Sequence, residues 1–110
     1  MPLTEDEILR LVAGVERREL RVWIESGWVR PARGEAGGEV FTEADCARVR
    51  LIQELRRDLQ VHDETLPLVL SLLDQVYGLR RELRRLVSAI QAEPEAVRRS
   101  IVARLRRPRD

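Results

Sequence analysis

Residues 63–92 constrain this 110-residue chain most, because their apolar side chains keep one unbroken helical period. Asp63 suits the N-cap of such a helix, and Pro67 lies early enough to lose little backbone hydrogen bonding. Thirty residues at about 1.5 Å each span roughly 45 Å, which exceeds the width expected of a domain of this size. We therefore expect part of the helix to leave the domain in which it begins.

The apolar pattern changes along this helix. In its first half apolar residues cover most of the circumference, which predicts enclosure by the same domain. These residues are Leu66, Leu68, Val69, Leu70, Leu72, Leu73, Val76 and Tyr77. From Leu72 onward a narrow seam remains, with spacings that alternate between four and three residues, as in a coiled coil. We expect it to form a homodimer; the alternative is that the C-terminal segment folds back on it. The seam residues are Leu72, Val76, Leu79, Leu83, Leu86 and Ile90.

Two short helices are expected at the start of the chain. Thr4 and Glu7 have the spacing of a capping box, and Gly14 suits the end of the first helix. A second helix is expected over about residues 16–26, with Gly27 ending it. Their expected buried residues are Ile8, Leu11 and Val12 on the first helix and Leu20, Trp23 and Ile24 on the second. Two short helices joined by a glycine-containing turn indicate a helix-turn-helix.

A wing and a third helix are expected next. Residues 28–31 and 39–41 are β-prone runs that flank a glycine-rich tip. Thr42 and Asp45 repeat the capping-box spacing and begin a helix that runs to about Leu59. Its expected inward residues are Cys46, Val49, Ile52, Leu55 and Leu59, and Trp28 is expected in the core with Trp23. Residues 95–107 predict a short basic helix with apolar Val97, Ile101 and Leu105.

The sequence thus predicts a mainly α protein. We expect a winged helix-turn-helix domain over residues 1–62, a dimerisation coiled coil over 63–92, and a short basic helix and tail over 93–110.

Composition narrows the function. The net charge of +1 conceals −5 over residues 1–78 and +6 over residues 79–110. Cys46 is the single cysteine, which excludes an internal disulfide, and His62 has no neighbouring nucleophile. No glycine-rich phosphate loop or metal-ligand spacing is found, so we expect neither an enzyme nor a cofactor or metal. Without a signal peptide or long apolar run, we expect a cytoplasmic protein that does not enter membranes.

The chain resembles the MerR-like winged helix-turn-helix superfamily over residues 3–62. The matching positions are Gly14-Val15, Arg18, Leu20-Arg21, Gly27-Trp28-Val29, Pro31 and Phe41-Thr42-Glu43-Ala44-Asp45. Residues 61–86 resemble one branch, the CbpM chaperone modulators, which modulate the DnaJ-like protein CbpA. The similarity lies in Leu70-Ser71-Leu72-Leu73-Asp74 and the later Leu-Arg-Arg-Glu-Leu.

The CbpM resemblance implies binding to the J-domain of a DnaJ-like co-chaperone. It implies that the chain inhibits two activities of the co-chaperone. One is stimulation of the ATPase activity of a heat-shock chaperone, and the other is DNA binding by the co-chaperone. A J-domain presents a basic helix, so an acidic partner has the right sign for it. The residues that we expect at this face are Glu16, Glu19, Glu25, Glu43, Asp45 and Asp74.

The alternative function is a MerR-like DNA-binding regulator of the heat-shock repressor type. A DNA-binding domain needs cations for the phosphates, whereas residues 1–78 are net acidic, so we expect DNA binding that is weak or absent. The contacts in that alternative are Arg17, Arg18, Arg21 and Arg33. A third option is a dimeric scaffold without an inhibitory role.

Overall fold

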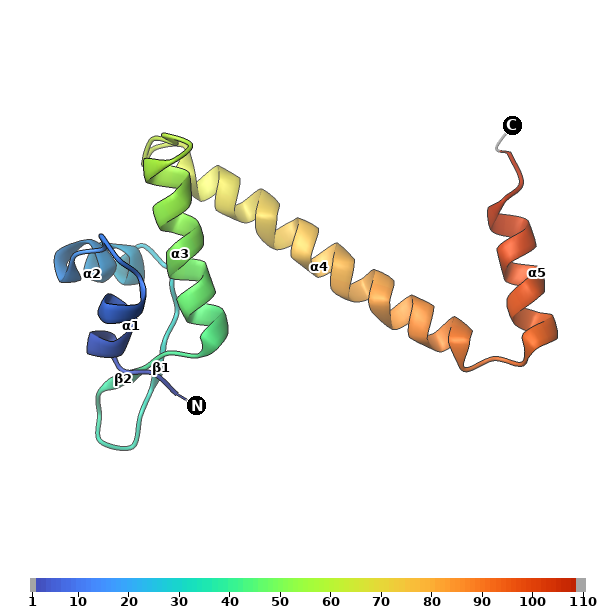
Figure 1. Cartoon of the computed structure of the whole chain (residues 1–110), viewed down its shortest axis with the longest axis horizontal. Helices are drawn as coiled ribbons and strands as arrows, with labels where there is room; N and C mark the ends of the chain where they lie inside the picture. Colours follow the sequence, from blue (N-terminus) through green and yellow to red (C-terminus); the bar gives the residue numbers. More distant parts are fainter. Residues whose placement is uncertain (1, 109–110) are drawn as a thin grey trace. The chain divides into compact units, whose positions relative to one another are not determined.

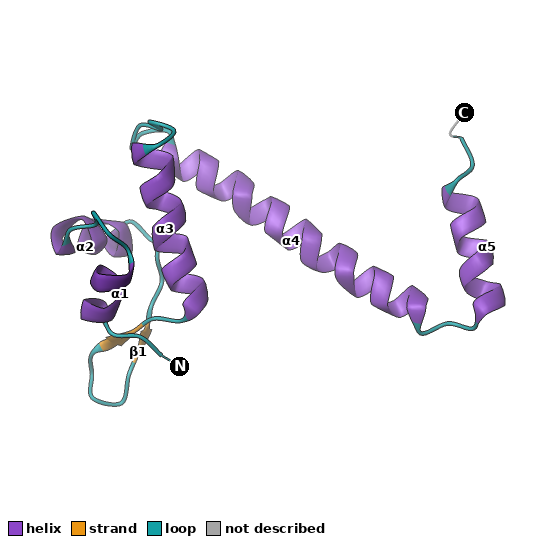
Figure 2. Cartoon of the chain, viewed as in Figure 1, coloured by secondary structure: helices purple, strands orange, loops and turns teal. Residues whose placement is uncertain are grey.

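The computed structural model describes residues 2–108, which form five helices and one two-stranded sheet (Figure 1). The elements in chain order are α1 (Glu5–Leu11), α2 (Arg17–Glu25), β1 (Ala32–Arg33), β2 (Glu39–Val40), α3 (Glu43–Arg57), α4 (Leu66–Gln91) and α5 (Glu95–Leu105). The mainly helical fold class with a two-stranded wing is confirmed (Figure 2). The chain divides into two compact units, with the boundary in the sequence between Leu70 and Ser71. We call them the winged-helix unit and the C-terminal unit.

Helix α1 begins with the predicted capping box. The Thr4 hydroxyl accepts from the Glu7 backbone N–H at 3.2 Å, and the Glu7 carboxylate accepts from the Thr4 N–H at 3.1 Å. Ile8 and Val12 are buried, but the prediction for Leu11 is wrong because this side chain is 49% exposed. The helix ends at Leu11 and Val12 is extended, so Val12 covers the core instead.

Helix α2 contributes two buried side chains to the core. Leu20 and Trp23 are buried as predicted, whereas Ile24 and Trp28 are only half-buried. Gly27 has a φ of +80°, which an L side chain rarely adopts, and it follows the end of the helix as predicted.

The wing is an antiparallel pair in which Ala32 lies opposite Val40 and Arg33 lies opposite Glu39. The prediction of its first strand at 28–31 is wrong. The backbone N–H groups of Trp28 and Val29 both donate to the Trp23 carbonyl, at 2.9 and 3.3 Å. They are therefore used in closing the end of α2 and are not free to form a ladder.

Phe41 extends the second wing strand toward the N-terminus. Its backbone N–H donates to the Leu3 carbonyl at 2.8 Å, and the Leu3 N–H donates to the Phe41 carbonyl at 2.7 Å. The Phe41 side chain is fully buried. This bridge ties the beginning of the chain to the wing.

Helix α3 begins with the second predicted capping box, in which Thr42 and Asp45 exchange hydrogen bonds of 2.9 and 3.0 Å. Its residues Cys46, Val49, Ile52 and Leu55 are buried as predicted. Leu59 is 68% exposed, so its inward placement is wrong. The helix ends at Arg57, two residues before Leu59, and the chain then turns at Gln60, whose φ is +53°.

Helix α4 begins at Leu66, and the predicted N-cap Asp63 is wrong. The Asp63 carboxylate accepts from Arg56 Nε at 2.9 Å instead. Leu66 and Leu70 are buried in the winged-helix unit. The predicted enclosure as far as Tyr77 is wrong, because the helix passes out of that unit after Leu70. Exposed apolar residues in this half are Leu68, Leu72, Val76 and Tyr77, while Val69 and Leu73 are half-buried.

In the C-terminal unit α4 carries the predicted seam. Leu79 is 70% exposed, Leu83 60% and Leu86 59%, so α5 does not cover these positions. The expected short basic helix is α5, which ends two residues earlier than predicted. Among the described residues no helix is long and apolar enough to cross a membrane.

Candidate interaction surfaces

The arginines of α2 carry ion pairs with acidic residues of neighbouring elements. Arg17 pairs with Glu5 at 3.1 Å and also with Asp6, both on α1. Arg21 lies 3.2 Å from Glu5 and 2.7 Å from Glu39 of the wing. The hydrogen bond from Arg17 lowers the pKa of the Asp6 carboxyl, and the one to Glu39 raises the pKa of Arg21. Two arginines of α2, the second helix of the helix-turn-helix, are therefore already paired with carboxylates.

The other two candidate DNA contacts are more open. The Arg18 side chain is 85% exposed and lies 3.0 Å from Glu16. Arg33 is exposed on β1, opposite Glu39 in the strand register. Among the four candidate DNA contacts, the structure therefore connects Arg17 with Arg21, because both pair with Glu5.

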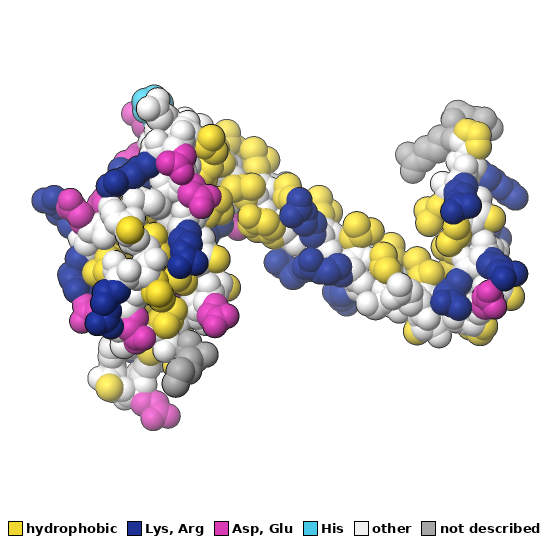
Figure 3. Space-filling model, viewed as in Figure 1, with side chains coloured by type: hydrophobic (Ala, Val, Ile, Leu, Met, Phe, Trp, Pro, Cys, Tyr) yellow, Lys and Arg dark blue, Asp and Glu magenta, His cyan; other side chains and the backbone are white. Residues whose placement is uncertain are grey.

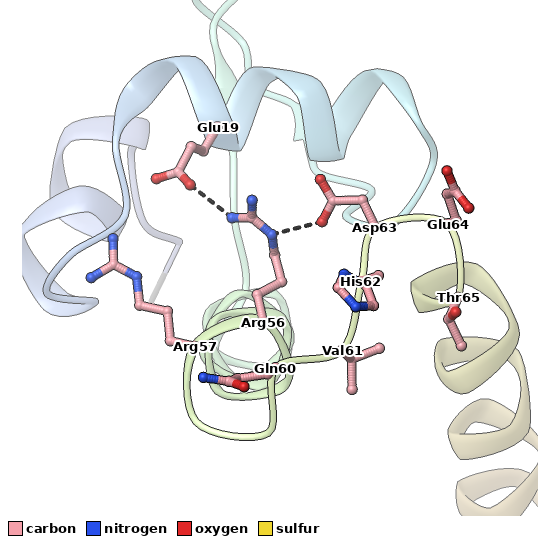
Figure 4. Close-up of a pocket in the computed structure, with 9 residues that line it drawn as sticks. All are labelled: Glu19, Arg56, Arg57, Gln60, Val61, His62, Asp63, Glu64 and Thr65. Atoms are coloured by element: carbon pink, nitrogen blue, oxygen red, sulfur yellow. Dashed lines mark hydrogen bonds and ion pairs between the residues drawn. The ribbon is translucent and has the colours of Figure 1, made fainter.

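A second charged cluster is centred on Arg56 of α3. Its Nη1 donates to Glu19 of α2 at 2.7 Å, and its Nε donates to Asp63 in the loop before α4 (Figure 4). The Arg56 guanidinium also lies 5.6 Å from the centre of the Trp23 ring, within cation–π range. The cluster therefore fastens α2 and the loop to α3.

Glu19 is a structural residue in this cluster. Its carboxylate also accepts from the backbone N–H of Glu16 at 3.0 Å, at the start of α2. Burial raises the pKa of Glu19, but the Glu16 N–H and the Arg56 guanidinium together lower it further, so its pKa lies below the ordinary value. Because two partners use this carboxylate, it is less available to another protein than the sequence suggested.

The hollow beside this cluster is polar. It is lined by Glu19, Arg56, Arg57, Gln60, Val61, His62, Asp63, Glu64 and Thr65 (Figure 4). Within the described residues, no group of three His, Cys, Asp or Glu side chains is arranged to hold a metal ion.

The acidic residues predicted for a partner face fall into three groups. Glu16, Glu25 and Glu43 are exposed on the winged-helix unit. Glu19 and Asp45 hold helix starts through hydrogen bonds to the backbone N–H groups of Glu16 and Thr42. Asp74 is exposed on α4 in the C-terminal unit.

Sequence reasoning missed the row of α3 side chains that holds the α1–α2 turn. Arg57 donates to the Gly14 carbonyl at 2.8 Å, Gln53 to the Ala13 carbonyl at 3.4 Å, and Arg50 to the Leu11 carbonyl at 3.5 Å. Their spacing of three and four residues is helical, which is the signal that could have grouped them. The row donates hydrogen bonds to the last carbonyl of α1 and to two carbonyls of the turn that follows it.

Two short helices, a glycine turn, a wing and a third helix define a winged helix-turn-helix regulator. The family model described as "MerR HTH family regulatory protein" matches residues 4–88. The chain therefore belongs to the MerR helix-turn-helix family of regulatory proteins, which are typically not enzymes. Neither the comparison with curated proteins nor that with solved structures gave a match.

Proposed function

We propose that this MerR-family chain regulates a protein partner, as a chaperone modulator that binds the J-domain of a DnaJ-like co-chaperone and inhibits its stimulation of the heat-shock ATPase. The observation that carries this proposal is the pairing of Arg17 and Arg21 with Glu5, Asp6 and Glu39. Binding to DNA phosphates depends on cations that are free to approach them, and these ion pairs engage two arginines of α2. The identity of the partner follows from the resemblance of residues 61–86 to the CbpM family.

The charge of the winged-helix unit supports a basic partner. Residues 1–70 hold 10 arginines and 14 acidic residues, a balance of −4. Such a surface steers a basic protein toward it and slows the approach of nucleic acid. Exposed carboxylates are the best candidates for the contact, because no helix cap depends on them. On the winged-helix unit these are Glu25 and Glu43. Glu16 is also exposed, and it occupies the N-cap position of α2 and pairs with Arg18.

We also propose that the regulator is a homodimer. Leu72, Leu79, Leu83 and Leu86 are each more than half exposed along one helix, and this spacing fits a partner helix. A second copy supplies such a helix with the same seam.

Titration of a labelled, isolated J-domain with the full chain at low salt tests the protein-partner proposal. We expect the variant E16Q/E25Q/E43Q to bind about tenfold more weakly, or roughly 1.4 kcal/mol. The matched control E82Q/E93Q/E95Q removes three acidic charges from the C-terminal unit and should bind as the wild type does. Absence of binding at low salt would mean that the partner is wrong, and equal affinity of both variants that the face is wrong.

Family membership keeps a DNA-binding regulator as the second candidate. The acidic unit predicts only non-specific duplex affinity, about 10⁻⁴–10⁻⁶ M at physiological salt. A nanomolar, salt-resistant complex with one DNA sequence would reverse this ranking. Arg17, Arg18, Arg21 and Arg33 would then be the contacts to replace.

A further inference from the structure

An open groove lies between the last part of α4 and α5, within the C-terminal unit. Pro94 precedes α5 with an extended backbone, at a φ of −56° and a ψ of 153°, and the chain turns between the two helices (Figure 1). The groove has a volume of about 680 Å³. Small-molecule sites usually have volumes of about 300–1,000 Å³. We call this hollow the α4–α5 groove.

The walls of the α4–α5 groove are mainly apolar. Val87 and Ile90 contribute from α4, and Val102 and Leu105 contribute from α5. Val87, Val102 and Leu105 are exposed, so they line the open groove instead of filling a core. Figure 3 shows hydrophobic side chains along the sides of the two helices that face each other. A ligand that covers these walls needs an apolar body.

The charged residues of the groove favour an anion. Among the described residues that line it, the cations Arg98, Arg99 and Arg106 outnumber one carboxylate, that of Glu95. The lining charges therefore sum to +2. Glu95 lies 2.7 Å from Arg99, which leaves Arg98 and Arg106 for a ligand. These two arginines stand four residues on either side of Val102, so they border the apolar wall of α5.

Arg98 indicates where the anionic end of a ligand would bind. The residue is half-buried, and its Nε atom is buried without a hydrogen-bond acceptor in the part of the chain that the structure describes. A buried donor without an acceptor costs free energy, so a ligand that supplies an acceptor gains affinity. Nε and one Nη of a guanidinium form a fork that matches the two oxygens of a carboxylate. The groove thus combines apolar walls with a position for a carboxylate.

We propose that the α4–α5 groove binds a free fatty acid, with its carboxylate on Arg98 and its alkyl chain along Val87, Ile90 and Val102. A helix of a partner protein fits less well. With side chains a helix is about 10 Å wide, so about 680 Å³ encloses roughly 9 Å of its length. Helical ligands use anchors at positions i, i+3, i+4 and i+7, which span about 10.5 Å. A single alkyl chain is narrower, so the same volume holds a longer ligand.

This site goes beyond the proposed function and uses a different surface. The J-domain contact is assigned to carboxylates of the winged-helix unit, whereas the fatty-acid contact depends on α4 and α5. Arg98→Gln should accordingly leave the J-domain titration unchanged, which makes failure of one proposal distinguishable from failure of the other. Ile90 belongs both to the groove and to the seam, so a second copy of the chain is the competing occupant.

Equilibrium dialysis of labelled dodecanoate against the full chain tests the proposal, at neutral pH and below the concentration at which dodecanoate forms micelles. We expect saturation at one dodecanoate per chain. Arg98→Gln should weaken binding by at least about tenfold, because glutamine lacks the charged fork. Arg104→Gln is the matched control, since Arg104 lines a different side of α5, with Val97 and Ile101, and this variant should bind as the wild type does.

A second pair of variants tests the apolar wall. Val102→Asp places a carboxylate in the groove and should weaken dodecanoate binding by at least about tenfold. Val97→Asp is the matched control, because Val97 is 42% exposed on the other side of α5 and Val102 is 41% exposed. It should keep the wild-type affinity. Far-ultraviolet circular dichroism can verify that both variants keep their helix content.

Four results would overturn the proposal. Equal losses in Arg98→Gln and Arg104→Gln would mean that net charge alone explains binding. Equal affinity for dodecyltrimethylammonium, a cation with the same alkyl chain, would mean that the arginines do not select the ligand. Tighter dodecanoate binding by Leu79→Glu with Leu83→Glu, the variant expected to be monomeric, would mean that a second copy covers the groove. Binding of anionic vesicles without binding of free dodecanoate would indicate a membrane surface instead.

Discussion

The two units use the same residue types in opposite ways. In the winged-helix unit Leu20 and Leu66 are fully buried, whereas Leu79 and Leu83 of the C-terminal unit are at least 60% exposed. Arginines differ in the same sense. Arg56 of α3 has a side chain 26% exposed and two carboxylate partners, but Arg85 of α4 is 78% exposed with one. The first unit thus encloses a core of its own, whereas the second, over its described residues 71–108, has none of its large apolar side chains fully buried and displays them, with its arginines, to solvent.

The largest effect that tests this contrast is expected at the seam. In Leu79→Glu with Leu83→Glu, the dimer loses four buried leucines and gains buried charge, which should cost about 6 kcal/mol or more of dimer stability. Sedimentation velocity should show a monomer. Ser88→Glu, on the opposite side of α4, is the matched control and should remain dimeric. A wild-type chain that is monomeric at about the tens-of-micromolar level would contradict the dimer.

Within the winged-helix unit the largest effect is expected at Phe41, whose side chain is fully buried. Phe41→Ala removes this ring and leaves a cavity, so the free energy of unfolding should fall by about 3–5 kcal/mol. Urea unfolding followed by tryptophan fluorescence measures it. Val22→Ala, at a residue 51% exposed on α2, is the control and should cost less than about 1 kcal/mol. Similar losses in both variants would contradict the self-sufficient core.

Two glycines sharpen the comparison further. Gly14 has a φ of +86°, and an added Cβ would lie 2.8 Å from Gln53 Nε2 and 3.0 Å from Arg57 Nη1. Gly14→Ala should therefore destabilise the winged-helix unit by about 1–2 kcal/mol. At Gly78 the nearest atom to an added Cβ is Arg81 Nη2, at 3.7 Å, and the backbone is helical. Gly78→Ala should stabilise α4 by about 0.5–1 kcal/mol. Thermal unfolding of both variants checks these opposite signs; a shift in one direction would refute the contrast.

The smallest effect concerns pH. The pKa of Glu19 is lowered in the folded state, so its contribution to stability is present above the ordinary glutamate pKa of about 4.5 and is lost as pH falls through the folded value. Glu19→Gln should cost about 1 kcal/mol at neutral pH. The same substitution should also make the free energy of unfolding less dependent on pH below the ordinary glutamate pKa. Glu25→Gln, at an exposed residue, should keep the wild-type pH profile.

Much of the fold could be predicted because its signals are local. Both threonine capping boxes placed a helix start correctly, since each depends on residues three positions apart. Leu59 was misplaced because helical periodicity continues past the residue where the backbone stops being helical. The first wing strand was misplaced because the N–H groups of Trp28 and Val29 are used by a carbonyl of α2, which composition does not reveal.

The candidate site was less predictable because its interactions connect distant positions. Arg56 and Glu19 lie 37 residues apart, and no spacing rule relates them. The sequence identified Arg21 as a possible phosphate contact, yet Glu5 reaches it only when α1 packs beside α2, and Glu39 only when the wing does. Charges can therefore be located from sequence, but their pairing depends on the tertiary structure.

The bridge between Leu3 and Phe41 has a consequence for synthesis of the chain. Leu3 is synthesised before Phe41, its backbone partner, which follows 38 residues later. The N-terminal segment must therefore stay unpaired while α1, α2 and the wing emerge, and it docks only when Phe41 is available.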